Sequence, residues 1–317
     1  MIRNKKLIIF LLFITIIIFF TSCNGNPIQE HLQYLASKEC MGRYPGTQGN
    51  ENAAEYISEN FKQYGLLPFK ETYFTSSEIT LRNIEKLLEV SLIYEDGTIT
   101  RFENGKDFIQ RLPQNCNLSL PITNKPNEED CILLLKNINE KNINDMKQYE
   151  DLPFIKAFLL YDNSLLKKGT DIKQDEKQLG KPYFSICDNM YKLIDKNYGK
   201  VININSSYVD EKTIVNNVIG KVEGKKKDTV LIISAHFDHA GFIGNNIWNG
   251  AIDNASGVSS LLELAKGIDK DSKPECDILF CAFNGEEAQL VGSKDIYELI
   301  KNDYENIYNI NLDFYRE

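Results

Sequence analysis

The segment Thr229-Val-Leu-Ile-Ile-Ser234-Ala-His236-Phe-Asp238-His239 joins a run of apolar, β-branched residues directly to a group of polar side chains. A short run of this kind is typical of a strand that is buried on both faces of a sheet. His236 therefore lies where the strand ends. In open α/β sheets, ligands bind beyond the carboxyl ends of the strands. The segment thus predicts an α/β fold with a candidate site at one edge of its sheet.

Acidic residues follow later elements in the same way. Residues 276–283 and 307–312 are typical of buried strands, and residues 258–268 are typical of an apolar helix. The polar side chains next to these elements are His236, Asp253, Glu286, Glu287 and Asp313. Because four separate segments deliver carboxylates or imidazole to the expected edge, we expect the side chains to converge there.

The types of side chain in this set indicate zinc. Imidazole and carboxylate ligands together suit Zn²⁺ or a similar borderline ion, whereas carboxylates alone would suggest Ca²⁺ or Mg²⁺. One of the neighbours Glu286 and Glu287 can hold metal while the other faces the cleft, because adjacent side chains diverge. The carboxylate that is not a ligand can act as a general base. Asp238 can accept a hydrogen bond from the second ring nitrogen of His236 and fix its tautomer.

Each residue also has a simpler explanation. A lone histidine after a strand is usually a loop residue, and a Glu–Glu pair is usually solvated surface. Asp253, followed by Asn254 and Ser256, is compatible with a turn and a helix cap. The combination at successive strand ends is what favours a catalytic metal site.

Four motifs in order resemble the zinc-dependent bacterial aminopeptidases of peptidase clan MH. They are Ser234-Ala-His236-Phe-Asp238-His239, Gly250-Ala-Ile-Asp253-Asn254-Ala-Ser256-Gly257, Phe283-Asn-Gly-Glu286-Glu287 with Gly292-Ser293, and Asn311-Leu-Asp313. The stretch from His31 to Leu66, with Gly42-Arg43 within it, resembles the opening of the same family. The resemblance implies the zinc exopeptidase fold, in which a mixed, mainly parallel sheet is flanked by helices.

The resemblance also implies roles for the candidate residues. The residues that would bind metal are His236, Asp253, Glu287 and Asp313. Asp253 would bridge a first zinc ion to a second one, which Glu287 and a further histidine would hold. Glu286 would be the general base and Asp238 would orient His236.

The family's second zinc site uses a histidine that lies well beyond the last Asp. This chain has only three histidines, His31, His236 and His239, so none follows His239. We expect His239 to be structural or to face the substrate, which leaves the second site one ligand short. This pattern favours a C-terminally truncated chain, weak or inactive by itself, over a pseudoenzyme that lost a ligand by substitution. The resemblance further implies a cis peptide bond between Asp253 and Asn254.

Residues 1–22 predict a secretory signal peptide. Basic residues precede an apolar run over residues 7–20, which is shorter than the roughly 20 residues of a typical spanning helix, and small residues follow. Phe20-Thr-Ser-Cys23 resembles a bacterial lipoprotein box, so we expect lipidation at Cys23. The protein would then be exported and tethered to a membrane of the bacterial cell envelope. An ordinary secretory signal with an incidental Cys23 is the alternative.

Residues 78–212 carry none of the metal motifs and alternate strand and turn signals. We expect an inserted β-rich domain there, and its order resembles the protease-associated domain that many members of the family insert at this point. The expected organisation is a signal peptide at 1–22, an N-terminal helical part of the peptidase domain at 23–77, the insert at 78–212 and the zinc peptidase domain at 213–317, incomplete at its C-terminus.

Composition narrows the function further. The net charge of −9 without a basic stripe argues against nucleic acid as a partner. Six cysteines follow Cys23 without a small-domain framework, and we expect mostly buried free thiols. We therefore expect an exported zinc aminopeptidase that hydrolyses N-terminal residues from peptides with a metal-activated water. The alternatives are a glutaminyl cyclase of the same fold, against which the insert and Ala255-Ser256-Gly257 argue, and a non-catalytic binding protein on the peptidase scaffold.

Overall fold

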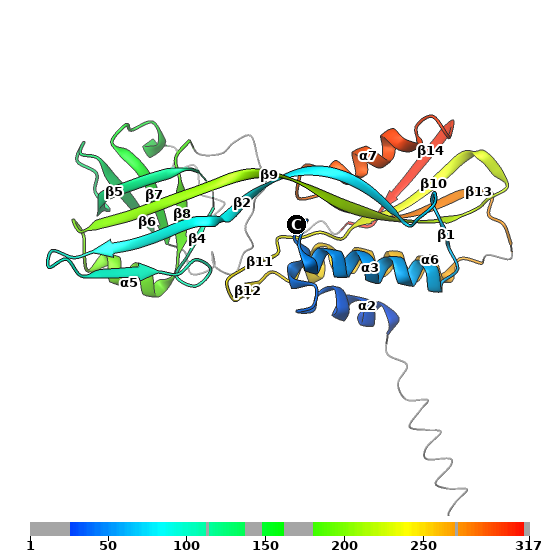
Figure 1. Ribbon diagram of the computed structural model, residues 1–317, viewed down its shortest axis with the longest axis horizontal. Coiled ribbons are helices and arrows are strands. Elements are labelled where there is room, and N and C mark those ends of the chain that lie inside the picture. The colour runs from blue at the N-terminus through cyan, green and yellow to red at the C-terminus, as the bar shows by residue number, and fades with distance from the viewer. Residues whose placement is uncertain (1–25, 112–113, 137–147, 162–179, 270–271, 314–317) are drawn as a thin grey trace, which may run out of the picture.

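Two long strands connect the two lobes of the molecule. The structure is a computed structural model that describes residues 26–111, 114–136, 148–161, 180–269 and 272–313. In Figure 1, β2 (Phe74–Ile93) and β9 (Val201–Val222) run through both lobes. They pair with each other in antiparallel orientation over most of their length, so one 12-stranded sheet extends from end to end. The expected signal peptide and Cys23 lie outside the described residues.

The sheet of the first lobe is built around three parallel strands. These are β10 (Lys226–His236), β13 (Cys276–Phe283) and β14 (Asn306–Asn311), with β10 in the middle. The register pairs His236 with Phe283 and Ser234 with Asn311. The three strands therefore end at nearly the same level, and the residues that follow them meet at one edge. On the other side of β13, β9 pairs in antiparallel orientation, and the two-residue strand β1 (Leu67–Pro68) pairs with β9.

Helices cover both faces of this part of the sheet. In Figure 1, α2 (Pro27–Leu35), α3 (Gln48–Gln63) and α6 (Ser256–Gly267) lie below it and α7 (Val291–Ile300) lies above it. Thr47 caps α3 by accepting a hydrogen bond from the backbone of Asn50, a standard way to satisfy a free N–H at a helix start. The main core packs fully buried side chains of the lower helices, such as Phe61 and Leu261, against Phe280 of β13.

The second lobe is built mostly from strands. Its elements are β3 (Ile99–Phe102), β4 (Phe108–Gln110), β5 (Cys116–Thr123), β6 (Cys131–Lys136), β7 (Ile155–Tyr161), β8 (Tyr183–Ile186) and α5 (Asp188–Asp195). Strands β5 to β8 are parallel neighbours, and β4 closes the sheet in antiparallel orientation. The boundaries expected at residues 78 and 212 fall inside β2 and β9. The two lobes therefore share two continuous strands.

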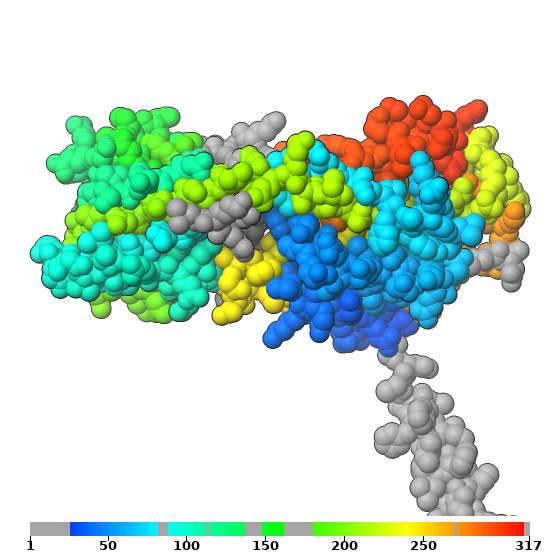
Figure 2. Space-filling model, in the orientation of Figure 1, coloured from blue at the N-terminus to red at the C-terminus, as the bar shows by residue number. Residues whose placement is uncertain are grey.

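A short loop of the first lobe touches the second lobe. It contains β11 (Phe242–Ile243) and β12 (Asn246–Ile247), which pair with each other. A Cβ atom on Gly105 would lie 2.4 Å from the carbonyl oxygen of Ile243, so the two backbones are in direct contact. In the space-filling view the yellow segment that contains these strands lies between the lobes (Figure 2).

The expected fold class is confirmed. The strands expected at 276–283 and 307–312 appear as β13 and β14, and the expected helix at 258–268 appears as α6. The expectation of a buried strand at 307–312 is wrong, because β14 lies at the edge of the sheet and is largely exposed. All six cysteines in the described part of the chain are free thiols, and three of them, Cys40, Cys131 and Cys281, are buried. No helix among the described residues is long and apolar enough to cross a membrane.

Candidate metal centre

Three donor groups meet at the carboxyl edge of the sheet. The Nε2 atom of His236 lies 3.2 Å from the Oδ1 atom of Asp253 and 3.6 Å from the Oδ1 atom of Asp313. His236 is 5% exposed, whereas the Asp253 and Asp313 side chains are 54% and 36% exposed. The buried imidazole thus forms the floor of the cluster and the two carboxylates open to solvent. The structure therefore brings together the three residues that the sequence assigned to the first metal.

The other ring nitrogen of His236 is held by the backbone. Its Nδ1 atom lies 3.2 Å from the carbonyl oxygen of Asp238 and 3.8 Å from Oδ1 of the same residue. A carbonyl oxygen can only accept, so Nδ1 carries the hydrogen and donates it. In the neutral ring the lone pair is then on Nε2, which faces Asp253 and Asp313.

The cluster favours positive charge. Burial by itself would lower the pKa of the His236 imidazole, but hydrogen bonds to Asp238 and Asp253 outweigh burial and raise the pKa to about 11. Glu286 adds to this effect through its charge. In the absence of a metal ion, the surrounding carboxylates therefore stabilise the protonated imidazole of His236. The same carboxylates would also stabilise a bound cation.

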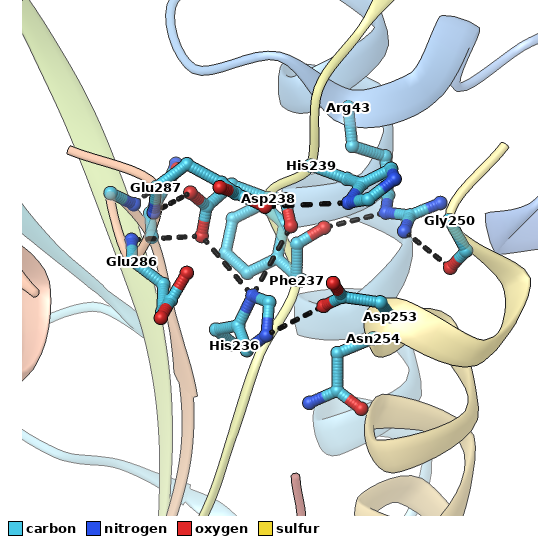
Figure 3. A network of polar contacts seen from close by, with 12 residues as sticks. Arg43, His236, Phe237, Asp238, His239, Gly250, Asp253, Asn254, Glu286 and Glu287 are labelled. Carbon is cyan, nitrogen blue, oxygen red and sulfur yellow. Dashed lines mark hydrogen bonds and ion pairs between the residues drawn. The ribbon is translucent and has the colours of Figure 1, made fainter. Parts of the chain in front are cut away.

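The carboxylate of Asp238 connects the two glutamates to the histidine strand. Asp238 is fully buried, and its two oxygens accept hydrogen bonds from the backbone N–H groups of Glu286 at 3.2 Å and Glu287 at 3.1 Å. Figure 3 shows both glutamates on the side of Asp238 away from Asp253. The residue expected to orient His236 thus also fixes the backbone of the expected base and of an expected ligand.

Three asparagines hold the turn that carries the glutamates. The amide of Asn284 donates to Oδ1 of Asn50 at 2.8 Å, and its backbone N–H donates to Oδ1 of Asn217 at 2.8 Å. Gly285 follows with a φ of 74°, a left-handed value that favours glycine. The turn therefore leaves β13 in a fixed direction and presents Glu286 and Glu287 to the cluster.

A second short segment delivers Asp253. It is the π-helical turn η3 (Ala251–Ala255), which continues into α6, and its Asp253–Asn254 peptide bond is cis, as the resemblance implies. The Asn254 amide donates to the carbonyl oxygen of Leu312 at 2.9 Å. Since Asp313 follows Leu312, this bond joins the segments of two candidate ligands.

A buried arginine fastens the loops around the cluster. Arg43, in the turn η1 (Met41–Arg43), is fully buried and donates to four backbone carbonyl groups. Their oxygens belong to Leu35, Phe237, Asn249 and Gly250. Burial lowers the pKa of the guanidinium to about 10, and the nearby charges of Asp238 and Asp253 oppose this. Arg43 therefore joins the segment that follows His236 to the segment that precedes Asp253.

His239 lies beside the same centre. Its Nδ1 atom is 3.4 Å from Oε1 of Glu287, and His239, Asp253 and Glu287 each have a donor atom within 4.8 Å of the others. The sequence interpretation assigned Glu287 and Asp253 to a second metal and gave His239 no ligand role. The structure places the imidazole of His239 beside those two acids.

A pocket opens next to the first cluster. It has a volume of about 150 Å³ and is lined by His236, Glu286 and Asp313 together with Leu290, Ser293 and residues of β13 and β14. The candidate base thus borders the same space as two candidate ligands.

The donor set fits zinc. Ligand distances of about 2.0–2.2 Å in a tetrahedral zinc site place neighbouring donor atoms about 3.3–3.6 Å apart. The separations of 3.2 and 3.6 Å from His236 to the two aspartates are of this size. One buried imidazole whose Nε2 faces two carboxylates is a chemically suitable set for this ion.

Sequence reasoning missed the residues that hold these groups in place. Arg43 was noted only as part of a motif, and Asn50 and Asn217 were not singled out. A buried asparagine or arginine far from the motifs carries no local signal of its partner. Asn284 had a weak signal, since it stands between a predicted strand and the glutamates.

Comparisons with known proteins agree with this geometry. Residues 217–316, which contain every predicted ligand, match the sequence profile of Peptidase family M28. This segment belongs to that family, as its motifs predicted.

Two relatives match part of the chain. The chain is 35% identical over 102 residues to a probable glutamate carboxypeptidase of Arabidopsis thaliana, which amounts to 30% of this chain and 14% of that protein. It is 46% identical over 65 residues to a probable zinc metalloprotease of Pyrenophora teres f. teres, 20% of this chain and 14% of that protein. The chain thus spans only a small part of the length of these relatives.

A solved structure extends the similarity to both lobes. A zinc aminopeptidase from Bacillus subtilis superposes with a TM-score of 0.63 at 18% identity, over 90% of this chain and 67% of that one. At this identity the likeness shows a shared fold.

Proposed function

We propose that the protein is a zinc-dependent aminopeptidase that removes N-terminal residues from peptides. The observation that carries the proposal is the convergence of His236, Asp253 and Asp313 beside the pocket that Glu286 borders. The family of residues 217–316 and the relatives named as zinc peptidases support it.

The residues would divide the work of peptide hydrolysis. When bound, zinc supplies a Lewis acid that polarises a carbonyl group and makes water nucleophilic near neutral pH. His236, Asp253 and Asp313 would hold it. Glu286 would take the proton from the attacking water and return it to the nitrogen of the leaving amine, which needs that proton to depart. Asp238 would keep Glu286 in place through its backbone N–H.

The charge around the site favours the amino end of a peptide. No lysine or arginine is among the described residues that line the pocket, and Arg43 is buried with four carbonyl partners. A site for a C-terminal carboxylate would need a cation, because carboxylates are recognised by paired positive charge. A free α-amine, in contrast, is suited to acidic surroundings.

Peptide products distinguish this proposal from its alternatives. We suggest incubating the protein and zinc with a peptide whose two ends differ, with an N-acetylated copy as control, and following the masses. We expect stepwise loss from the N-terminus and no cleavage of the acetylated copy. Loss from the C-terminus would indicate a carboxypeptidase, as the name of the Arabidopsis relative suggests, and loss of ammonia from an N-terminal glutamine would indicate a cyclase. No reaction with zinc bound would support a binding protein.

We also propose that the protein is exported and anchored to a membrane of the bacterial cell envelope by lipid on Cys23. The support comes from the sequence of residues 1–23 alone. Expression of the wild-type chain and of Cys23→Ser in a bacterium, followed by membrane fractionation, tests this. We expect the wild type in the membrane fraction and Cys23→Ser outside it. An equal distribution of the two proteins would contradict lipidation.

A further inference from the structure

The loop of residues 240–250 leads from the strand of His236 to the turn that carries Asp253. It contains three glycines, three asparagines and no charged residue. Its two strands, β11 and β12, have only two residues each and pair with each other. Glycine adds freedom to the backbone, and a short isolated hairpin is at best marginally stable in water. Loop 240–250 therefore needs support from outside itself.

The second lobe supports the tip of this loop. A Cβ atom on Gly105, which is buried in the turn between β3 and β4, would lie 2.4 Å from the carbonyl oxygen of Ile243. On the other side of the contact, a Cβ atom on Gly244 would lie 3.2 Å from the carbonyl oxygen of Asn104. The backbones of the two lobes thus meet with no room for a side chain at Gly105.

Turn η1 holds the base of the loop. The backbone N–H of Gly241 donates to the carbonyl oxygen of Gly42 at 2.9 Å, and that of Trp248 donates to the carbonyl oxygen of Gly241 at 2.9 Å. A Cβ atom on Gly42 would lie 2.3 Å from the carbonyl oxygen of Gly241 and 2.6 Å from that of Trp248. Because the base is packed this closely, it has no free space that could absorb a displacement of the tip.

The end of the loop is tied to the turn of Asp253. Arg43 donates to the carbonyl oxygens of Asn249 at 2.7 Å and Gly250 at 2.8 Å, and Figure 3 shows the second of these bonds. The carbonyl oxygen of Gly250 also accepts from the backbone N–H of Ala255 at 3.0 Å. A Cβ atom on Gly250 would lie 2.4 Å from the carbonyl oxygen of Asp253. The last residue of the loop and the candidate ligand therefore move together.

We propose that Gly105 of the second lobe is a positioning residue for the metal centre. Its contact with Ile243 holds loop 240–250 in place, and the loop in turn holds Asp253 where it can bind zinc. The inference rests on the proposed function, which assigns zinc to Asp253. The contact is not needed to join the lobes, because β2 and β9 already run through both of them.

The competing explanation is that the contact only stabilises the packing of the lobes. Breaking it would then lower the free energy of unfolding and leave both the loop and the zinc affinity unchanged. Trp248 reports on the loop directly, because it is the only tryptophan of the chain and is 9% exposed. A displaced loop would expose its ring to water and move its fluorescence to longer wavelength.

Gly105→Ala is the test, with Gly97→Ala as the matched control. The two glycines have φ values of 81° and 82°, so alanine meets the same backbone strain at both positions. A Cβ atom at Gly97 has nothing within 4 Å, so only Gly105→Ala also strikes the loop. We expect zinc affinity to fall by about 10-fold in Gly105→Ala, the lower end of the effect of replacing residues that orient metal ligands. Gly97→Ala should keep the wild-type affinity.

Three measurements on each purified variant are needed. Competition with a colorimetric chelator gives the zinc affinity, the emission of Trp248 in the zinc-free protein gives the state of the loop, and urea denaturation gives the stability. We expect emission at longer wavelength in Gly105→Ala and wild-type emission in Gly97→Ala. A change in stability without a change in affinity or emission would support the competing explanation.

Hydrogen exchange in the wild type gives a readout that needs no variant. If the contact favours zinc binding, zinc binding must favour the contact by the same factor. We therefore expect bound zinc to slow exchange in the turn of residues 103–107 by up to about 10-fold. The control is the turn of residues 94–98, where the N–H of Gly97 donates to the carbonyl oxygen of Tyr94, and its exchange should not change. Mass spectrometry of peptides from the two turns measures both rates.

Each outcome has a defined meaning. Equal zinc affinity and equal Trp248 emission in Gly105→Ala and Gly97→Ala would overturn the inference, and the proposed peptidase would stand if the wild type hydrolyses peptides. Where Gly105→Ala does not fold, exchange in turn 103–107 that zinc fails to slow would overturn it. Zinc affinity that falls only in Gly105→Ala, in a protein without peptidase activity, would support the inference and contradict the proposed function. No zinc binding by the wild type would overturn both.

Discussion

At the scale of single residues, Asp238 and Glu286 explain how an acidic cluster becomes ordered. The carboxylate of Asp238 has no exposed surface and accepts both backbone N–H groups of the glutamate pair. Its main chain meanwhile accepts from Nδ1 of His236. One residue therefore sets the direction of His236, a proposed ligand, and of Glu286, the proposed base.

Replacing Glu286 tests whether this residue is the base. In Glu286→Gln we expect zinc binding to be retained and peptide hydrolysis to fall by roughly 10²–10⁴-fold, because the amide cannot accept the proton. Zinc content and the hydrolysis rate should be measured on the same sample. Full activity in this variant would mean that another group is the base.

Replacing the positioning residue should instead affect the metal. In Asp238→Asn the amide NH₂ group would face one of the two backbone N–H groups, so we expect zinc affinity to fall by about 10–100-fold. Competition with a colorimetric zinc chelator measures the affinity. The control is Asp303→Asn, an exposed aspartate away from the centre, which should leave the affinity unchanged. Equal affinities in the two variants would contradict the role of Asp238.

At the scale of elements, the site forms at the edge of the sheet where three parallel strands end. The register of β10 with β13 and β14 brings the segments after them to one edge. Such convergence follows from patterns visible in the sequence, namely apolar strand signals followed by acidic residues. The contacts that hold the loops around the site in place could not be predicted. They include the hydrogen bonds of Arg43 to carbonyl groups up to 207 residues away in the sequence.

Replacing Arg43 tests whether this residue holds the loops in place. A lysine in its place has three donors on one nitrogen and cannot reach carbonyl groups arranged around a planar guanidinium. We expect Arg43→Lys to lower the free energy of unfolding by about 2–4 kcal/mol, because buried carbonyl oxygens lose their donors. Urea denaturation measures this. Arg101→Lys, at an exposed position of β3, should change it by less than about 0.5 kcal/mol.

The opposite end of the same strands contains a buried aspartate with a different role. Asp277 of β13 is 1% exposed. Its donors are Lys221, Lys227, the backbone N–H of Gly224 and the hydroxyl of Tyr304. Burial by itself would raise its pKa, but these donors outweigh burial and lower the pKa from 3.8 to about 2.

This pKa shift predicts a pH dependence of stability. Because the folded state binds the proton less tightly than the unfolded chain, the stabilisation is present above pH 3.8 and is lost as the pH falls toward about 2. We expect Asp277→Asn to be less stable than the wild type at pH 7 by roughly 1–3 kcal/mol. The difference in unfolding free energy should shrink over that acid range. A difference that stays constant down to pH 2 would show that Asp277 does not titrate with this shift.

At the scale of the whole molecule, one sheet runs through both lobes, which local sequence patterns could not reveal. The boundaries of the expected insert, residues 78 and 212, fall inside β2 and β9. Much of β9 is exposed in its middle, so no buried apolar pattern marks it as a continuous strand. The position of His239 beside Glu287 was hidden for a related reason, since it depends on how segments that are distant in the sequence pack together.

The most direct test of the account is the zinc dependence of aminopeptidase activity. The purified protein should be stripped with a chelator, dialysed, and assayed for release of the N-terminal residue from a peptide as zinc is added back. We expect activity to disappear on stripping and to return as zinc binds, while the His236→Ala variant remains inactive throughout. Hydrolysis that persists after complete removal of zinc, or none after zinc is bound, would contradict the account.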